Sequence, residues 1–310
     1  MAHNLNNIKP AAQHVLVFGP PKSGKTQILA NLAEQGFKLI WFDLENGSST
    51  LLKLSEEAKN NITLIKIMDT IEAPRAHGTI DKILKGGVFK ICDAHGTVDC
   101  AICKRNNIFD DNHTELNIPT NHIEADSNTV YILDSASQLT TSINATVTIN
   151  KDETYKEQFD DWAAQGKYLN RIFNRLQTSP NHWAVTAHEI LAEREDGGKR
   201  LVPSIGTTNY AVNSAKFFDH VIYMDKVNLK HRAWSSTSYS NNVITGSRLD
   251  IEIERMEAPG LGDIFKGIPG IPSNSNSNKQ QANNMLNNIS NNSSGNKLSA
   301  ILGAKKHDLK

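Results

Sequence analysis

The segment from Gly19 to Thr26 reads Gly-Pro-Pro-Lys-Ser-Gly-Lys-Thr and fits the phosphate-binding pattern G-x-x-x-x-G-K-[ST] at every position. Glycines let backbone N–H groups surround phosphate oxygens, and the start of a following helix adds a partial positive charge. We expect Lys25 to reach the β- and γ-phosphates of ATP and Thr26 to ligate Mg²⁺. A pocket that binds nucleotide without hydrolysing it is the alternative. The predicted nucleotide contacts are Gly19, Pro20, Pro21, Lys22, Ser23, Gly24, Lys25 and Thr26.

Carboxylates follow two apolar runs that look like buried strands. In parallel sheets ligands bind at the carboxyl ends of the strands. Asp134 directly follows the apolar run Val-Tyr-Ile-Leu, so we expect its carboxylate to bind Mg²⁺. The next residue is Ser135 and not a glutamate, so a water-activating base must come from elsewhere. Asp43 and Glu45 end another run and, two residues apart, project to one face. Glu45 is the better candidate because it lies nearer the strand tip and reaches further, although it could simply end the strand.

All three cysteines lie in one short stretch, Cys92-Asp-Ala-His95-Gly-Thr-Val-Asp-Cys100-Ala-Ile-Cys103. The spacing C-x2-H-x4-C-x2-C gives two ligand pairs separated by a turn, which is typical of tetrahedral Zn²⁺ sites. The fourth ligand could be His95, His113 or His122. Four protein ligands would leave no open position, so the zinc would be structural. Three reduced cysteines in a loop are the alternative.

The elements that must position these residues alternate between strands and helices. Strands are expected at His14–Gly19, Lys38–Phe42, Ile62–Ile67, Val130–Asp134, His182–Ala187, Phe217–Met224 and Leu249–Arg255, and helices at Lys25–Gln35, Ile71–Leu84 and Lys156–Leu176. This alternation predicts an α/β fold with a doubly wound, mainly parallel sheet.

Two segments depart from this rhythm. Residues 88–127 hold every cysteine and few long apolar runs, which predicts a zinc-binding insertion between the core segments 1–87 and 128–267. Residues 268–310 are rich in Asn and Ser, a composition that predicts a disordered tail. Its last residues regain some apolar pattern, so a short terminal peptide could dock a replication or single-strand-binding protein, or simply remain solvated.

Several short motifs occur in the order and spacing of the RecA-type recombinase core. They are Phe42-Asp43-Leu44-Glu45, Tyr131-Ile132-Leu133-Asp134-Ser135 with Leu139-Thr140, Val185-Thr186-Ala187-His188, and Asn213-Ser214-Ala215-Lys216-Phe217. Over about residues 12–87 and 128–258 the chain resembles a phage-encoded RecA-like P-loop ATPase of the single-strand annealing and recombination type. The resemblance implies that Glu45 polarises the attacking water and Asp134 supports Mg²⁺. His188 takes the place of the γ-phosphate-sensing Gln of bacterial recombinases, although a structural His at a strand end is the alternative.

The resemblance also implies a surface for single-stranded DNA. In RecA-like folds the segment after His188 contacts DNA, and here it carries Arg194, Lys199 and Arg200 around a Gly-Gly pair that we expect to form a mobile loop. Four acidic residues share it, so an ordinary solvated loop is the alternative. Further basic residues that could contact phosphates are Lys104, Arg105, Lys226, Lys230, His231 and Arg232.

Composition limits the remaining choices. The 310 residues allow at most two domains, and 33 basic against 33 acidic residues exclude a globally basic nucleic-acid binder. Few cysteines, no long apolar run and no signal-like start favour a cytoplasmic protein without a membrane span, in a host cytoplasm if phage-encoded. We expect a homo-oligomeric ring or filament that hydrolyses ATP on single-stranded DNA. The rivals are a nucleotide-switched adaptor or loader of replication proteins and a small-molecule phosphotransferase.

Overall fold

The computed structural model describes residues 12–108, 112–152, 154–235, 242–248, 256–257 and 261–266, all within the unit that spans residues 1–268. The predicted strand at Leu249–Arg255 and the predicted tail lie outside the described residues. The main sheet contains β1 (His14–Phe18), β2 (Lys38–Asp43), β3 (Ile62–Lys66), β6 (Thr129–Asp134), β7 (His182–Ala187), β10 (His220–Val227), β11 (Lys230–Trp234), β12 (Gly246–Ser247) and β13 (Met256–Glu257).

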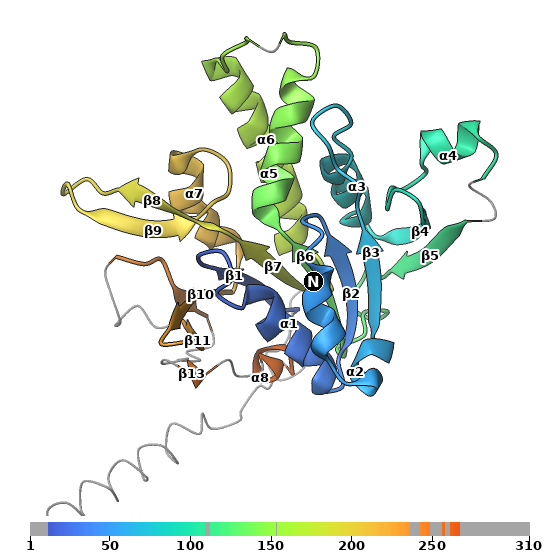
Figure 1. The fold of residues 1–310 in the computed structure, drawn as a ribbon, viewed down its shortest axis with the longest axis horizontal. Coiled ribbons are helices and arrows are strands. Elements are labelled where there is room, and N and C mark those ends of the chain that lie inside the picture. Colours follow the sequence, from blue (N-terminus) through green and yellow to red (C-terminus); the bar gives the residue numbers. More distant parts are fainter. Residues whose placement is uncertain are drawn as a thin grey trace, which may run out of the picture. The chain divides into compact units, whose positions relative to one another are not determined.

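Parallel pairing dominates this sheet, as the sequence predicts. Its order is β13-β11-β10-β1-β7-β6-β2-β3, with β12 also on β10, and every pair from β10 to β3 is parallel. Only β11, β12 and β13 pair antiparallel. Two small hairpins stand apart: β4 (Gly87–Cys92) with β5 (His113–Ile118), and β8 (Glu189–Glu193) with β9 (Lys199–Pro203) (Figure 1).

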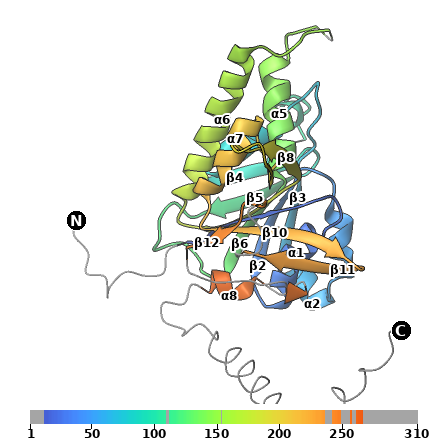
Figure 2. The ribbon, with the colours of Figure 1, turned by 90° about the vertical axis from the view of Figure 1, so that its left-hand side faces the viewer.

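Helices cover both faces of the sheet. The helices are α1 (Lys25–Glu34), α2 (Glu56–Asn60), α3 (Ala76–Ile83), α4 (Ala101–Arg105), α5 (Ala136–Thr148), α6 (Phe159–Gln177), α7 (Thr208–Ser214) and α8 (Gly262–Phe265), with 3₁₀ turns η2 (Ser48–Lys53) and η3 (Ala215–Phe217). Alternate residues of β1 enter two cores: Val15 and Val17 pack with α1 and α8, whereas Leu16 and Phe18 pack on the face of α3, α5 and α6. Figure 2 shows α5 and α6 side by side. A strand buried on both faces explains the continuous apolar runs.

The observed elements differ from the expected ones mainly at their ends. The helix expected from Ile71 starts only at Ala76, because Pro74 disfavours helical backbone before it and Asp69 Oδ1 accepts hydrogen bonds from the N–H groups of Arg75 and Ala76. The sequence reasoning missed α5, α7 and the β8–β9 hairpin. No helix among the described residues is long and apolar enough to cross a membrane.

Histidines begin three neighbouring strands of the sheet, and all are buried: His14, His182 and His220. The N–H of Gln13 donates to His182 Nδ1 at 2.9 Å, which requires an unprotonated Nδ1. His220 contacts Gln13 Oε1 at 2.9 Å and Ser247 Oγ at 2.8 Å. Burial lowers the pKa of His182 and of His220 to about 4. The folded chain therefore holds both rings neutral at pH values where the unfolded chain protonates them.

This difference predicts a loss of stability in mild acid. Protons bind the unfolded chain near the ordinary histidine pKa of about 6.5, so stability falls as the pH drops from there toward 4. Between about pH 7.5 and 5.5 we expect the unfolding free energy to fall by roughly 2–3 kcal/mol from these two groups, measured by urea denaturation. His182→Asn should remove about half of that decline, whereas the exposed control His122→Gln should not change it. A wild-type unfolding free energy that is flat over this range would contradict the prediction.

Candidate active site

The predicted phosphate loop joins β1 to α1 and wraps around its own lysine. Lys25 Nζ donates to the carbonyl oxygens of Gly19, at 3.0 Å, and Pro20, at 2.9 Å. Burial lowers the pKa of Lys25, and the nearby charges of Glu45 and Asp134 partly oppose that effect. A Cβ on Gly19 would lie 2.0 Å from the Met224 carbonyl oxygen, so only glycine fits there. Phosphate oxygens are stronger acceptors for this ammonium than the two carbonyls it now contacts.

Asp134, at the end of β6, lies where a Mg²⁺ carboxylate is expected. Its Oδ2 accepts a hydrogen bond from Thr26 Oγ1 at 3.1 Å, and its Oδ1 accepts one from Thr186. Burial, with the charges of Glu45 and Asp43, raises the pKa of Asp134 to about 6. A hydroxyl and a buried carboxylate are hard oxygen donors of the kind that Mg²⁺ prefers, so Thr26 and Asp134 fit such an ion.

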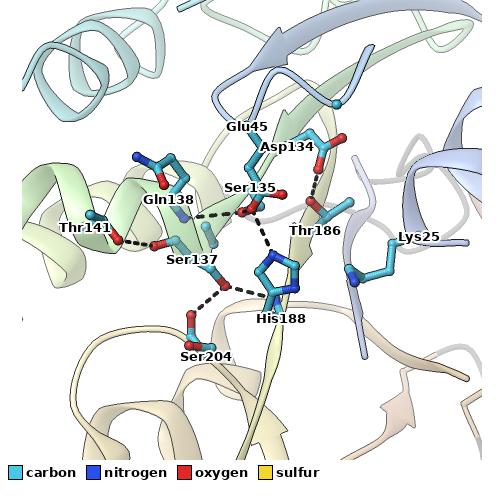
Figure 3. A network of polar contacts seen from close by, with 12 residues as sticks. Lys25, Glu45, Asp134, Ser135, Ser137, Gln138, Thr141, Thr186, His188 and Ser204 are labelled. Carbon is cyan, nitrogen blue, oxygen red and sulfur yellow. Dashed lines mark hydrogen bonds and ion pairs between the residues drawn. The ribbon is translucent and has the colours of Figure 1, made fainter. Parts of the chain in front are cut away.

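The side chains of Glu45 and His188 contact each other beside Asp134 and Lys25 (Figure 3). His188 Nε2 lies 3.3 Å from Glu45 Oε1, and the same oxygen accepts a hydrogen bond from Ser135 Oγ. Burial disfavours ionisation of Glu45, but the hydrogen bonds from His188 and Ser135 and the charge of Lys25 outweigh it and lower its pKa. The two side chains keep 29% and 36% exposure, enough for water to reach them. The arrangement holds an ionised carboxylate beside the phosphate loop.

Asp43 has a different environment from Glu45. Its Oδ1 accepts hydrogen bonds from the N–H groups of Glu45 and Gly47, each at 3.1 Å, and its Oδ2 accepts one from Ser48 N at 3.2 Å. The Asp43 side chain is buried at 1% exposure. It therefore shapes the loop that carries Glu45, which makes it unsuited to the role of alternative base.

Strand order explains why residues far apart in the sequence converge. β6 lies between β2 and β7, and β7 pairs with β1, so the ends of four adjacent parallel strands carry Glu45, Asp134, His188 and the phosphate loop. Asp43 is in register with Asp134. The carboxyl edge of the sheet is thus the place where all predicted nucleotide residues meet.

The segment with Arg194, Lys199 and Arg200 forms a β-hairpin with the Gly197–Gly198 pair in its turn, where the sequence predicts a loop. β8 and β9 pair from Glu189 with Pro203 to Glu193 with Lys199, and Gly197 takes the turn with a φ of 77°. Ala192 and Val202 are buried against Ala211 of α7, which anchors the hairpin. At its tip Arg194 forms an ion pair with Asp196 at 2.7 Å.

One hydroxyl fixes both ends of this hairpin. Ser137 Oγ, in the first turn of α5, accepts from His188 N at 2.9 Å and donates to the Ser204 carbonyl at 2.9 Å. Ser204 N in turn donates to the His188 carbonyl at 2.7 Å. Since Ser135 caps the same helix and contacts Glu45, the start of α5 supports both the hairpin base and the nucleotide site (Figure 3).

The cysteine cluster brings together the end of β4, the turn that follows it and the start of α4. His95 Nδ1 lies 3.3 Å from Cys103 Sγ, 3.6 Å from Cys100 Sγ and 3.8 Å from Cys92 Sγ, and all four ligand atoms lie within 4.8 Å of one another. Tetrahedral Zn²⁺ with bonds of about 2.0–2.3 Å requires ligand separations of roughly 3.3–3.8 Å, and the three distances from His95 to the sulfur atoms lie in that range. The geometry therefore fits zinc, with His95 in place of His113 or His122. Burial and the neighbouring Cys100 and Cys92 raise the pKa of Cys103 to about 12, so a nearby cation would be needed to ionise this thiol at neutral pH.

The cluster is attached to the main sheet through backbone contacts. The His95 carbonyl accepts from Met68 N at 3.1 Å, and a Cβ on Gly96 would lie 2.1 Å from the Lys66 carbonyl at the end of β3. Gly96 adopts a φ of 62°. The turn between the two ligand pairs needs glycine for both its conformation and its close approach to β3.

A complete phosphate-loop sequence between a buried strand and a helix, facing carboxylates from two neighbouring strands, defines a P-loop ATPase domain of α/β type. The chain belongs to the AAA domain family, whose model matches residues 11–249. No curated protein matches the sequence.

Several solved structures are similar to the chain, among them a recombinase and a secretion-system ATPase. The first is a RadB recombinase, 16% identical over 73% of this chain and 80% of that chain, with a TM-score of 0.36. The second is an ATPase of the type III secretion system of pathogenic bacteria, 12% identical over 69% of this chain and 52% of that chain, with a TM-score of 0.40.

Sequence reasoning missed several residues that the structure brings to the site. Thr186 contacts Asp134, Ser135 contacts Glu45, and Ser137 holds the base of the hairpin. Thr186 and Ser135 stand beside predicted site residues, so their hydroxyls were visible signals. Ser137 carries no such signal, because its partners lie 51 and 67 residues away in the sequence.

Proposed function

We propose that the protein hydrolyses ATP and uses the hydrolysis cycle to change its affinity for single-stranded DNA in recombination or replication. The supporting observation is the base of the β8–β9 hairpin: its first strand begins one residue after His188, and His188 contacts Glu45. A side chain that senses the γ-phosphate would therefore act directly on the segment with Arg194, Lys199 and Arg200.

In this proposal the hydrolysis step uses the chain's own groups. Lys25 exchanges the carbonyls of Gly19 and Pro20 for phosphate oxygens. Mg²⁺, held by Thr26 and Asp134, would supply charge neutralisation on the phosphates. A water oxygen attacks the γ-phosphorus, the bond to the ADP oxygen breaks, and the Glu45 carboxylate takes the water proton. His188 and Ser135 orient that carboxylate through their contacts with Oε1.

Exposed aromatic side chains at the start of α6 are a second feature consistent with DNA. Phe159 is 77% exposed and Trp162 is 46% exposed. Bases of single strands stack on such rings, although Asp160 and Asp161 in the same first turn of α6 repel phosphates. Exposed apolar residues also suit protein docking, which keeps the nucleotide-switched adaptor or loader as the second candidate. The proposal includes a ring or filament of identical copies.

Single-stranded DNA is expected to stimulate ATP turnover, and DNA affinity should be higher with a non-hydrolysable ATP analogue than with ADP. Replacing Lys199 and Arg200 together by Ala should weaken DNA binding and reduce the slope of log affinity against log salt by up to about 1.4, since each phosphate contact on a single strand contributes about 0.7. ATP binding should stay unchanged. DNA titrations at several salt concentrations and steady-state turnover measure both effects.

A matched control removes two exposed lysines elsewhere, Lys53 and Lys82, and should leave DNA affinity as in the wild type. His188→Ala should give similar DNA affinity in the ATP and ADP states. If wild-type protein binds single strands equally in both states, or not at all, the adaptor function replaces this proposal.

A further inference from the structure

The antiparallel strand β11 reaches the phosphate loop through one side chain. His231 Nδ1 lies 2.8 Å from the carbonyl oxygen of Ser23, within hydrogen-bond distance. A carbonyl oxygen can only accept, so Nδ1 carries the proton and donates. The partners are 208 residues apart in the sequence, and the basic stretch around His231 otherwise has no part in the site described above.

This contact fixes the orientation of a peptide group that faces the nucleotide. In a trans peptide the C=O and the following N–H point in opposite directions. Holding the Ser23 carbonyl toward His231 therefore directs the Gly24 N–H to the opposite side, into the loop that is expected to surround phosphate. Gly24 has a φ of 98° and forms the N-cap of α1. As a glycine it offers little resistance of its own to rotation of this peptide.

The imidazole ring also fills the space beside Gly24. A Cβ at this position would lie 2.8 Å from His231 Nδ1 and 3.0 Å from its Cγ. The main sheet fixes the position of the His231 backbone. His231 pairs with Lys226 of β10, and β10 pairs with β1, the strand that leads into the phosphate loop. Beyond His231, Ala233 and Trp234 of β11 are buried. The loop is thus held between its own strand and a histidine two strands away in the same sheet.

We propose that His231 is a positioning residue for nucleotide binding: it locks the Ser23–Gly24 peptide so that the Gly24 N–H donates to a phosphate oxygen. This role rests on the proposed binding of nucleotide by the loop from Gly19 to Thr26. Backbone N–H groups of such loops surround the α- and β-phosphates, which ATP and ADP both carry, so the role of His231 affects binding of the two nucleotides alike and leaves the hydrolysis step unchanged.

The test compares His231→Ala with His231→Asn, whose side-chain amide nitrogen can donate from nearly the same position as Nδ1. With Ala, the dissociation constants of ATP, ADP and inorganic tripolyphosphate should each rise roughly 3- to 10-fold, the value of one hydrogen bond, and kcat at saturating ATP should stay within about twofold. Asn should restore wild-type affinity. Lys230→Ala is the control, because the adjacent residue projects to the other face of the strand.

Two results would overturn the role of His231 alone: unchanged affinities in the Ala variant, or an Asn variant as weak as Ala. Weaker ATP binding with unchanged tripolyphosphate binding would also overturn it, because His231 would then contact the nucleoside. Wild-type protein that binds neither ATP nor tripolyphosphate would instead remove the phosphate loop's proposed function and the role of His231 with it. Thermal unfolding of the nucleotide-free variants detects any general loss of folding.

Discussion

Glu45→Gln protein is expected to bind ATP as tightly as the wild type and to hydrolyse it on the order of 10²–10⁴ times more slowly, the usual contribution of a general base. The carboxylate contacts Ser135 and His188 and does not contact the phosphate loop, so the substitution should leave binding intact. Glutamine keeps the shape and can still accept from Ser135, but it cannot take a proton from water. Nucleotide titration and single-turnover hydrolysis measure the two quantities separately.

The pKa of Glu45 adds a condition on pH. The hydrogen bonds to Glu45 and the nearby Lys25 lower its pKa below the ordinary glutamate value, so the carboxylate is ionised at neutral pH. It becomes protonated, and stops acting as a base, only at a pH below the ordinary glutamate pKa.

Lys25→Ala provides the contrasting variant, which should lose nucleotide binding itself because the ammonium contacts the ground-state phosphates. Turnover of Glu45→Gln near the wild-type rate would remove Glu45 from the mechanism.

The parts of the site that could be predicted from the sequence are those specified by short spacing or by the ends of strands. The phosphate loop is contiguous, and the cysteine–histidine cluster spans residues 92–103, so the chain itself brings these side chains together. Asp134 and Glu45 required one further step, the rule that parallel strands present their carboxyl ends at one edge. That rule holds here because β2 and β6 are neighbours in register.

The β8–β9 hairpin and His231 were not predictable in the same way. The hairpin sequence is charged and contains Gly197 and Gly198, which favour a loop. Contacts with distant residues support its strands, including the hydrogen bond from Leu201 N to the Asn242 carbonyl at 2.6 Å. His231 reads as part of a basic stretch and gains its position only from the antiparallel pairing of β10 with β11. Non-local pairing of short strands leaves little trace in local sequence.

The second large effect concerns zinc. Purified, reduced protein is expected to carry about one zinc per chain, and Cys100→Ser or Cys103→Ser should lose it. Apparent zinc affinities of roughly 10–16 kcal/mol act as folding energy in small modules, and the three cysteines form a separate cluster of buried side chains. We therefore expect the amides of residues 87–108 and 112–118 to lose protection from hydrogen exchange while β1, β6 and β7 keep theirs.

Histidine variants make this prediction specific to the geometry. His95→Gln should lose the metal, because His95 Nδ1 lies within 3.3–3.8 Å of all three sulfur atoms, whereas His122→Gln should keep it. Metal analysis and hydrogen exchange on the same samples check both halves. Loss of zinc should also loosen Met68, whose N–H donates to the His95 carbonyl, since the metal-binding turn rests on the end of β3. Reduced protein that contains no zinc yet protects the β4–β5 hairpin fully would show that the cluster is held by thiol packing alone.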